Sequence, residues 1–128
     1  MDYLKRSTID PNHLPGRVIH NCVGQGNYPI SSKKMTVCFA HYSADSGPMA
    51  PHNHAEETVV VLSSEKGYVR WGLGKDKLEH KQMLEAGDVM HFAELEWHVF
   101  GYDEGGFLDV LCMYGQVDKI RPEDIARK

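Results

Sequence analysis

Short runs of apolar, β-branched and aromatic residues recur along most of the chain, and turn-forming residues separate them. Such residues suit pleated, half-buried strands, and the runs do not alternate with segments of helical periodicity. A series of short strands without intervening helices predicts an all-β sandwich or barrel. The runs that we expect to form strands are residues 35–42, 58–62, 68–72, 81–84, 89–92, 97–102 and 107–114.

Turn residues predict how these strands connect. The sequence SSEKG stands between the second and third runs, so residues 58–62 and 68–72 are predicted to pair as a hairpin. The tail has the one helix start in the chain, because Pro122 suits a first helical position and acidic residues follow it. We expect a single domain over residues 1–128, made of an N-terminal irregular or edge-strand segment (1–34), a barrel core (35–114) and a C-terminal tail with a short helix (115–128).

Composition limits the partners and the compartment. The chain has 128 residues and a formal charge of −4, and its charges are interspersed, which argues against a nucleic-acid or anionic-membrane surface. The apolar runs, residues 59–62 among them, are far too short to span a bilayer, and the N-terminus lacks the apolar stretch of a signal peptide. Three cysteines, in no disulfide or zinc pattern, suggest a reducing compartment. We therefore expect a cytoplasmic protein.

Histidine is the residue type that stands out, with eight in the chain. His52 and His54 are two residues apart, so on an extended chain both imidazoles face the same side. Glu57 follows closely, and His98 lies in another predicted strand that a closed sheet could bring alongside. Imidazoles with one carboxylate suit iron(II), zinc, manganese, nickel or copper better than calcium or magnesium. Four protein ligands leave open positions only on a five- or six-coordinate ion, which favours iron(II), manganese or nickel in a catalytic site.

Two segments resemble the motifs of the cupin superfamily, G-x5-H-x-H-x3,4-E-x6-G and G-x5-P-x-G-x2-H-x3-N. Residues 47–57 are similar to the first motif, and residues 87–98 are similar to the second, with the family's own spacing from Gly87 to His98. The resemblance covers about residues 36–114, which is most of the chain.

The sequence departs from both motifs. Gly47 is one residue closer to the histidine pair than the first motif asks, and the gap before the carboxylate is one residue short if Glu57 is the ligand. The apolar run that follows favours Glu57, whereas strict strand alternation would favour Glu56. In the second motif the proline, glycine and asparagine are replaced at non-ligand positions by Ala93, Leu95 and Tyr102.

The resemblance implies a small single-domain, RmlC-like jelly-roll barrel, also described as a double-stranded β-helix, that forms a homodimer. It also implies one bound divalent transition metal: iron(II), manganese, nickel or zinc. The metal ligands implied are His52, His54, Glu57 and His98.

Other polar residues are candidates for the substrate pocket. By alternation Tyr102 shares the face of His98, where it could contact a substrate or a metal-bound water, or simply fill the core. His41 and His91 lie in predicted strands and could act on protons, although a core or surface position is the more common outcome for each. Arg70 could pair with a substrate carboxylate, or face solvent. We expect surface positions for His13, His20 and His80.

These observations lead to three functional hypotheses. The first is a small metalloenzyme that acts on a keto acid, sugar acid or aromatic acid by dioxygenation, isomerisation or lyase chemistry. The second is a non-enzymatic cupin that binds or senses a small ligand, and the third is a structural barrel with an adventitious ion. Phosphoryl transfer and triad-type hydrolysis are poorly supported, because the chain has no nucleotide-binding glycine loop and no nucleophile motif.

Overall fold

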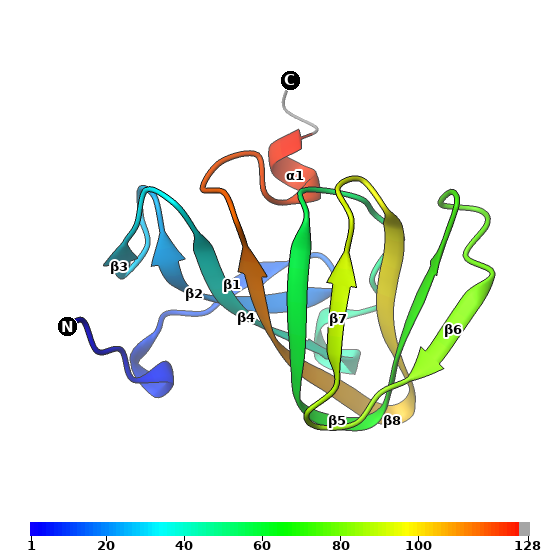
Figure 1. Cartoon of the computed structure of the whole chain (residues 1–128). Helices are drawn as coiled ribbons and strands as arrows, with labels where there is room; N and C mark the ends of the chain where they lie inside the picture. The colour runs from blue at the N-terminus through cyan, green and yellow to red at the C-terminus, as the bar shows by residue number, and fades with distance from the viewer. Residues whose placement is uncertain (126–128) are drawn as a thin grey trace.

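The computed structural model describes residues 1–125, and these form β-strands with three short helical segments (Figure 1). None of the helices in this part of the chain has the length and apolar character needed to cross a membrane. The helical segments are η1 (Arg6–Thr8), η2 (Ala44–Ser46) and α1 (Pro122–Ile125). The strands are β1 (Asn12–Leu14), β2 (Arg17–Gly24), β3 (Ile30–Ser31), β4 (Thr36–Ser43), β5 (Glu57–Gly72), β6 (His80–Met83), β7 (Val89–Phe92) and β8 (Trp97–Tyr114).

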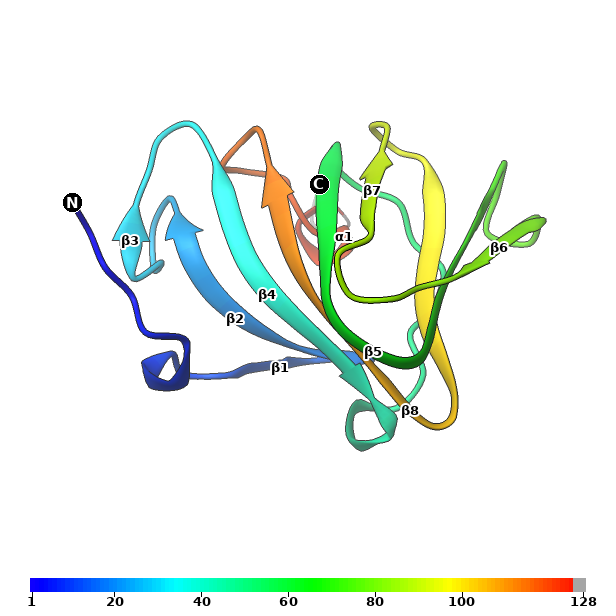
Figure 2. The ribbon, with the colours of Figure 1, turned by 60° about the horizontal axis from the view of Figure 1, so that its bottom comes forward.

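Two long strands, β5 and β8, hold the fold together. They pair antiparallel from Glu57 opposite Tyr114 to Gly72 opposite Trp97, and both bend along their length (Figure 2). The first half of β5 also pairs with β7 and its second half with β6, while the end of β8 pairs with β4, β4 with β2, and β2 with β1 and β3. The strands therefore curve into two layers around a common interior, which confirms the all-β prediction.

The predicted hairpin between residues 58–62 and 68–72 is wrong. Both segments belong to β5, and residues 68–72 pair with β6 and β8 instead. The turn-forming residues between them produce register shifts, with Lys66 at φ 58°, so the strand bends without ending. On β8, an added Cβ at Gly106 would lie 2.2 Å from a β5 carbonyl oxygen, so only glycine fits this crossing.

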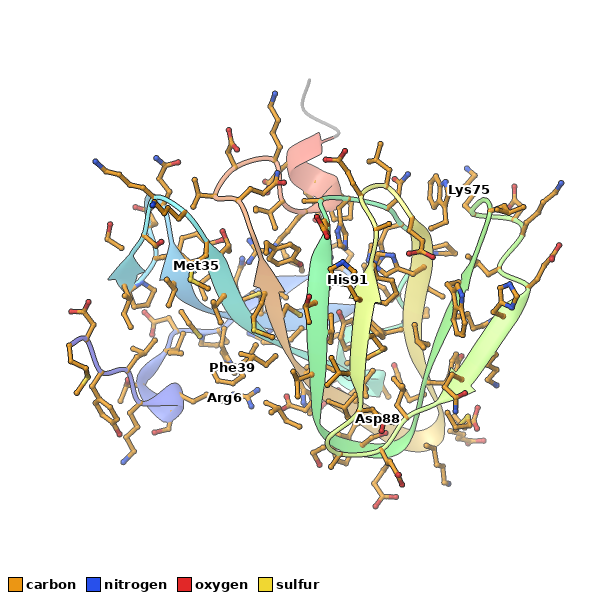
Figure 3. The ribbon with its side chains drawn as sticks, in the orientation of Figure 1. Arg6, Met35, Phe39, Lys75, Asp88 and His91 are labelled. Atoms are coloured by element: carbon orange, nitrogen blue, oxygen red, sulfur yellow. The ribbon has the colours of Figure 1, made fainter. Side chains whose placement is uncertain are left out.

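The N-terminal segment is more regular than expected. β2 is an eight-residue strand between β1 and β4, where the sequence indicated an irregular or edge-strand path. Pro15 and Gly16 precede this strand and Gly24 is its last residue, so none of these turn-forming residues interrupts it. Arg6 fixes the segment before β1 to the outside of the sheet, through two 2.7 Å hydrogen bonds to Asp109 and a contact with the Phe39 ring (Figure 3).

The C-terminal tail closes one end of the barrel. Ile120 packs into the core, and its carbonyl accepts a hydrogen bond from the Ala55 amide at 3.4 Å. α1 follows directly and lies beside the start of β5 and the end of β8 (Figure 1). The predicted helix is thus present over Pro122–Ile125, and the rest of the expected tail, residues 126–128, lies outside the described residues.

Candidate metal centre

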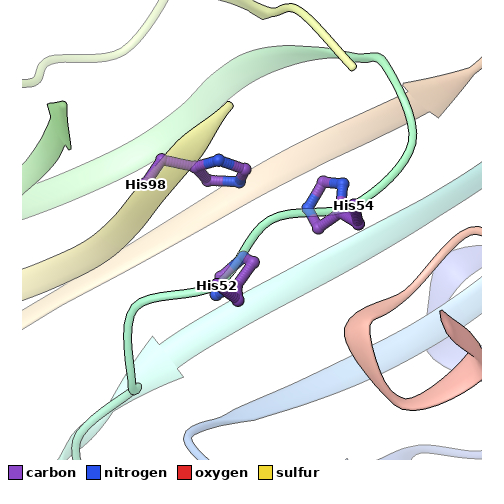
Figure 4. Close-up of side chains that lie close together, drawn as sticks. All are labelled: His52, His54 and His98. Carbon is purple, nitrogen blue, oxygen red and sulfur yellow. The ribbon is translucent and has the colours of Figure 1, made fainter. Parts of the chain in front are cut away.

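Three histidines meet inside the barrel, at the end that the tail closes. His52 and His54 lie on the segment that leads into β5, and His98 is the second residue of β8 (Figure 4). One ring nitrogen from each lies within 4.8 Å of the others. Reciprocal backbone hydrogen bonds of 2.9 and 3.0 Å between His52 and His98 tie the two segments together. The backbone therefore fixes the positions of these rings.

Each ring is also oriented by its own hydrogen bond. In every case Nδ1 lies within hydrogen-bond distance of a main-chain carbonyl: His52 with Ala50 at 3.1 Å, His54 with Ala55 at 2.8 Å, and His98 with Glu96 at 2.7 Å. A carbonyl only accepts, so Nδ1 carries the proton and Nε2 keeps its lone pair. This is how metal-binding histidines are usually held, with the second nitrogen engaged by the surrounding protein.

Glu57 completes the cluster. Its side chain is 3% exposed, and its Oε1 lies 3.4 Å from His54 Nε2 and 3.9 Å from His98 Nε2. Two atoms of the cluster, Glu57 Oε1 and His98 Nε2, are buried without a hydrogen-bond partner. Each such group costs about 1–3 kcal/mol when left unsatisfied. A cation among these atoms would satisfy both, so the residues present fit a metal ion.

The structure also distinguishes the two adjacent glutamates. The Glu56 side chain is 63% exposed and lies 2.8 Å from His91 Nε2 on the outer surface. Glu57 points inward because it begins β5, where it alternates with Val59 and Val61 in the core. Glu57 is therefore the carboxylate that lies beside the histidines.

Burial controls the protonation of the cluster in the absence of a cation. Desolvation, together with the neighbouring imidazoles, lowers the pKa of His98 to about 2 and contributes to a pKa of about 4 for His52. Desolvation also raises the pKa of Glu57, against the opposing effects of His54 and of a hydrogen bond with Tyr114. The rings of His52 and His98 are consequently neutral at pH 7, which is the form that binds a metal.

The surroundings of the cluster are tightly packed. The Phe92 ring stacks on His98 with centroids 4.0 Å apart, and Tyr114 packs against His54. A cavity of about 20 Å³ adjoins His52, His54 and Glu57. Arg17 and Arg121 line the same cavity, and sequence reasoning missed both. Nothing in the sequence marks Arg17 as inward-facing, because arginine on a strand usually points to solvent.

The three predicted proton-transfer residues lie elsewhere. Tyr102 shares the face of His98 as predicted, but it stands further along β8, where its hydroxyl donates to the Gly47 carbonyl at 3.4 Å. His41 and His91 both lie on the outer surface. For each of them a core or surface position was expected to be more common than a position in the substrate pocket. His41 Nδ1 lies 3.0 Å from Asp109, and His91 hydrogen-bonds Thr58 and Glu56 (Figure 3).

Arg70 is not at the cluster either. It is exposed, and its guanidinium donates to the Leu78 carbonyl at 3.0 Å. The structure therefore brings together the four predicted metal ligands and separates them from the other predicted pocket residues.

Solved structures have a fold similar to that of this chain, although the sequence matches no family model and no curated protein. A protein from Planctomyces limnophilus aligns over 97% of this chain and 94% of its own, with a TM-score of 0.72 and 14% identity. The polyketide cyclase RemF from Streptomyces resistomycificus aligns over 89% and 78%, with a TM-score of 0.70 and 18% identity. The chain has the cupin fold. At these identities the likeness shows the fold alone.

Other cupin-fold structures similar to this chain are those of enzymes with longer chains. The oxalate decarboxylase of Lactobacillus farciminis, solved with formate, aligns over 89% of this chain with a TM-score of 0.66 and 12% identity. Fe(II)-HppE, solved with an alternative substrate, aligns over 89% with a TM-score of 0.64 and 13% identity. The chain spans 33% of the decarboxylase chain and 60% of the HppE chain.

Proposed function

We propose that this cupin is a metal-dependent enzyme acting on a small oxygenated molecule, such as a keto acid, sugar acid or aromatic acid. His52, His54, Glu57 and His98 hold one divalent transition metal. The observation that carries the proposal is the pair of buried, unpartnered atoms, Glu57 Oε1 and His98 Nε2, that face each other across the cluster. A fold that retains such a costly pair without a ligand to satisfy it is unusual.

Iron(II) and manganese(II) suit this donor set best. Three imidazole nitrogens and one carboxylate oxygen leave open positions on an ion that takes five or six ligands, whereas a tetrahedral zinc ion would be saturated. The similar structures include Fe(II)-HppE and an oxalate decarboxylase of Bacillus subtilis with Mn(II) centres. When bound, such a metal polarises a carbonyl or carboxyl oxygen of the substrate as a Lewis acid.

The protein keeps the histidine ligands uncharged, fixes their orientation and shields the ligand side chains from water. The backbone carbonyls orient the three rings, Phe92 covers one face of His98, and all four ligand side chains are buried away from bulk water. Dioxygenation, isomerisation and lyase chemistry all use an ion held in this way. The fold does not select among them, because function depends on the side chains of the site.

Two experiments test the proposal, metal analysis first and turnover assays second. We expect protein purified without an affinity tag to bind one manganese(II) or iron(II) per chain, and His98→Ala to lose the metal. His13→Ala, a change at an exposed histidine, is the matched control and should retain it. Where the alanine variant fails to fold, Glu57→Gln, which preserves side-chain volume, replaces it. Full metal retention in His98→Ala refutes the ligand assignment.

The metal-loaded protein is then assayed against catechols, keto acids and uronates. Oxygen consumption selects dioxygenation, and product formed without oxygen selects isomerase or lyase chemistry. Tight ligand binding with no turnover of any substrate in the panel rejects the enzyme and favours the alternative, a ligand-binding or sensor cupin.

A further inference from the structure

An ion pair between a buried arginine and a partly exposed glutamate links the tail to the wall of the metal centre. Arg17, the first residue of β2, has a side chain that is only 5% exposed. Its guanidinium donates to both carboxylate oxygens of Glu123 on α1, at 2.9 and 3.0 Å, and to the Pro15 carbonyl at 3.1 Å. The Pro15 bond holds the guanidinium in place independently of the tail. Two parallel bonds of this kind are the geometry with which arginine recognises any carboxylate.

Arg17 borders the cavity that also touches the predicted metal ligands. That cavity, of about 20 Å³, is lined by His52, His54 and Glu57 and also by Arg17 and Arg121. It has room for about one water molecule and is too small for an organic ligand. A ligand that reaches the metal through this cavity must therefore displace part of its wall, which includes Arg121 and Pro122 of the tail.

The charges around the cavity favour an anionic ligand over a neutral one. The two positive charges of Arg17 and Arg121 equal in number the two negative charges of Glu57 and Glu123. The Arg121 side chain donates a hydrogen bond to an uncharged group, the Asn21 amide oxygen, at 2.7 Å. A divalent cation bound by the histidines would then carry charge that nothing in the wall compensates. A carboxylate ligand supplies this compensation, and a neutral ligand does not.

We infer that the metal centre takes a small carboxylate, and that the carboxylate replaces Glu123 on Arg17 so that α1 opens as the ligand enters. The inference rests on the proposed function, because it assigns the substrate class of the same metal site. In this account Glu123 occupies the position of the ligand's carboxylate in the closed protein, and Arg17 is a binding residue for the substrate.

Calorimetry on the manganese(II)-loaded protein tests the substrate class. Acetate, glycolate, pyruvate and oxalate are compared with acetamide, glycolamide, pyruvamide and oxamide, which have nearly the same shape and no charge. We expect at least one carboxylate to bind ten-fold or more tightly than its amide. Equal binding of every carboxylate and its amide overturns the inference.

Substitutions at the ion pair test the mechanism of entry. Arg17→Gln should weaken binding of the carboxylate about ten-fold or more, since a hydrogen bond to a charged group is lost. Glu123→Gln should instead tighten it about two- to five-fold, because a partly exposed competitor is weakened. Asp118→Asn and Lys119→Gln remove charges from exposed tail positions and serve as matched controls without effect. Weaker carboxylate binding in Glu123→Gln contradicts the proposal that the ligand competes with Glu123 for Arg17. This variant keeps Arg17 itself, so the result does not depend on replacing a buried residue.

Hydrogen exchange reports the opening of α1. The Ala55 amide, which donates to the Ile120 carbonyl, should exchange faster when pyruvate is added to the metal-loaded protein and stay unchanged with pyruvamide. Slower exchange with pyruvate refutes displacement of the tail. Failure to bind manganese(II) at all would reject the proposed function, whereas stoichiometric metal binding without preference for carboxylates rejects only this inference.

Discussion

Glu57→Gln should raise the stability of the metal-free protein and abolish most of its stabilisation by metal. In the wild-type cluster, Glu57 Oε1 and His98 Nε2 are both acceptors, 3.9 Å apart, and neither has a partner. A glutamine amide supplies N–H donors toward His98 Nε2 and His54 Nε2, while its carbonyl still accepts from Tyr114, which hydrogen-bonds Glu57 in the wild type. The substitution therefore satisfies acceptors that the wild type leaves unsatisfied.

The size of the effect follows from the cost of unsatisfied groups. Satisfying one buried acceptor is worth about 1–3 kcal/mol, which corresponds to a rise in Tm of roughly 3–10 °C for a domain of this size. A metal at 100 times its Kd stabilises the wild type by about 2.7 kcal/mol. If the substitution weakens metal binding about 100-fold, the same concentration stabilises the variant by only about 0.4 kcal/mol.

Differential scanning calorimetry with a chelator, and then with manganese(II), measures both effects. Glu56→Gln is the matched control, because the neighbouring glutamate is exposed and lies outside the cluster. The control should follow the wild type in both conditions. A Glu57→Gln variant that is less stable than the wild type without metal, or that gains as much stability from metal, would refute this description of the cluster.

Two further predictions concern the rest of the fold. Burial raises the pKa of Asp109, but hydrogen bonds from Arg6 and His41 outweigh it, so the pKa lies below its ordinary value of 3.8. Asp109 should thus contribute about 1–2 kcal/mol above about pH 5, and this contribution is lost as pH falls through the lowered pKa. In urea unfolding, the difference between wild type and Asp109→Asn should be largest above about pH 5 and shrink as pH falls below 3.8, and a difference that stays constant over this range contradicts the assignment. Phe92→Ala should cost about 3–5 kcal/mol in the same assay, because the ring is buried against a ligand histidine, whereas Val89→Ala at an exposed position of β7 should change stability by less than about 0.5 kcal/mol.

The cluster of three histidines and Glu57 was predictable because its signal is local and chemical. The spacing of His52 and His54, followed by a carboxylate before an apolar run, specifies which side chains share a face. Their convergence with His98 required only that the sheet close on itself. The choice between Glu56 and Glu57 needed the structure, because the break in alternation before β5 decides which of them points inward.

The rest of the site depends on long-range packing that no local pattern encodes. On β4 the apolar residues Val37 and Phe39 face outward and Ala40 and Tyr42 face inward, so alternation alone does not say on which side His41 lies. Arg17 was missed because its burial depends on Glu123, which lies 106 residues away in the chain. The bend of β5 was missed because turn-forming residues end a strand in one context and bend it in another.

A crystal structure of tag-free, manganese-loaded protein, with anomalous diffraction measured at a wavelength where manganese scatters strongly, tests most directly whether these four residues hold a metal. We expect one anomalous peak per chain, within bonding distance of the Nε2 atoms of His52, His54 and His98 and of Glu57 Oε1. A peak bound at other residues, or fully loaded protein with no peak at this cluster, would contradict it.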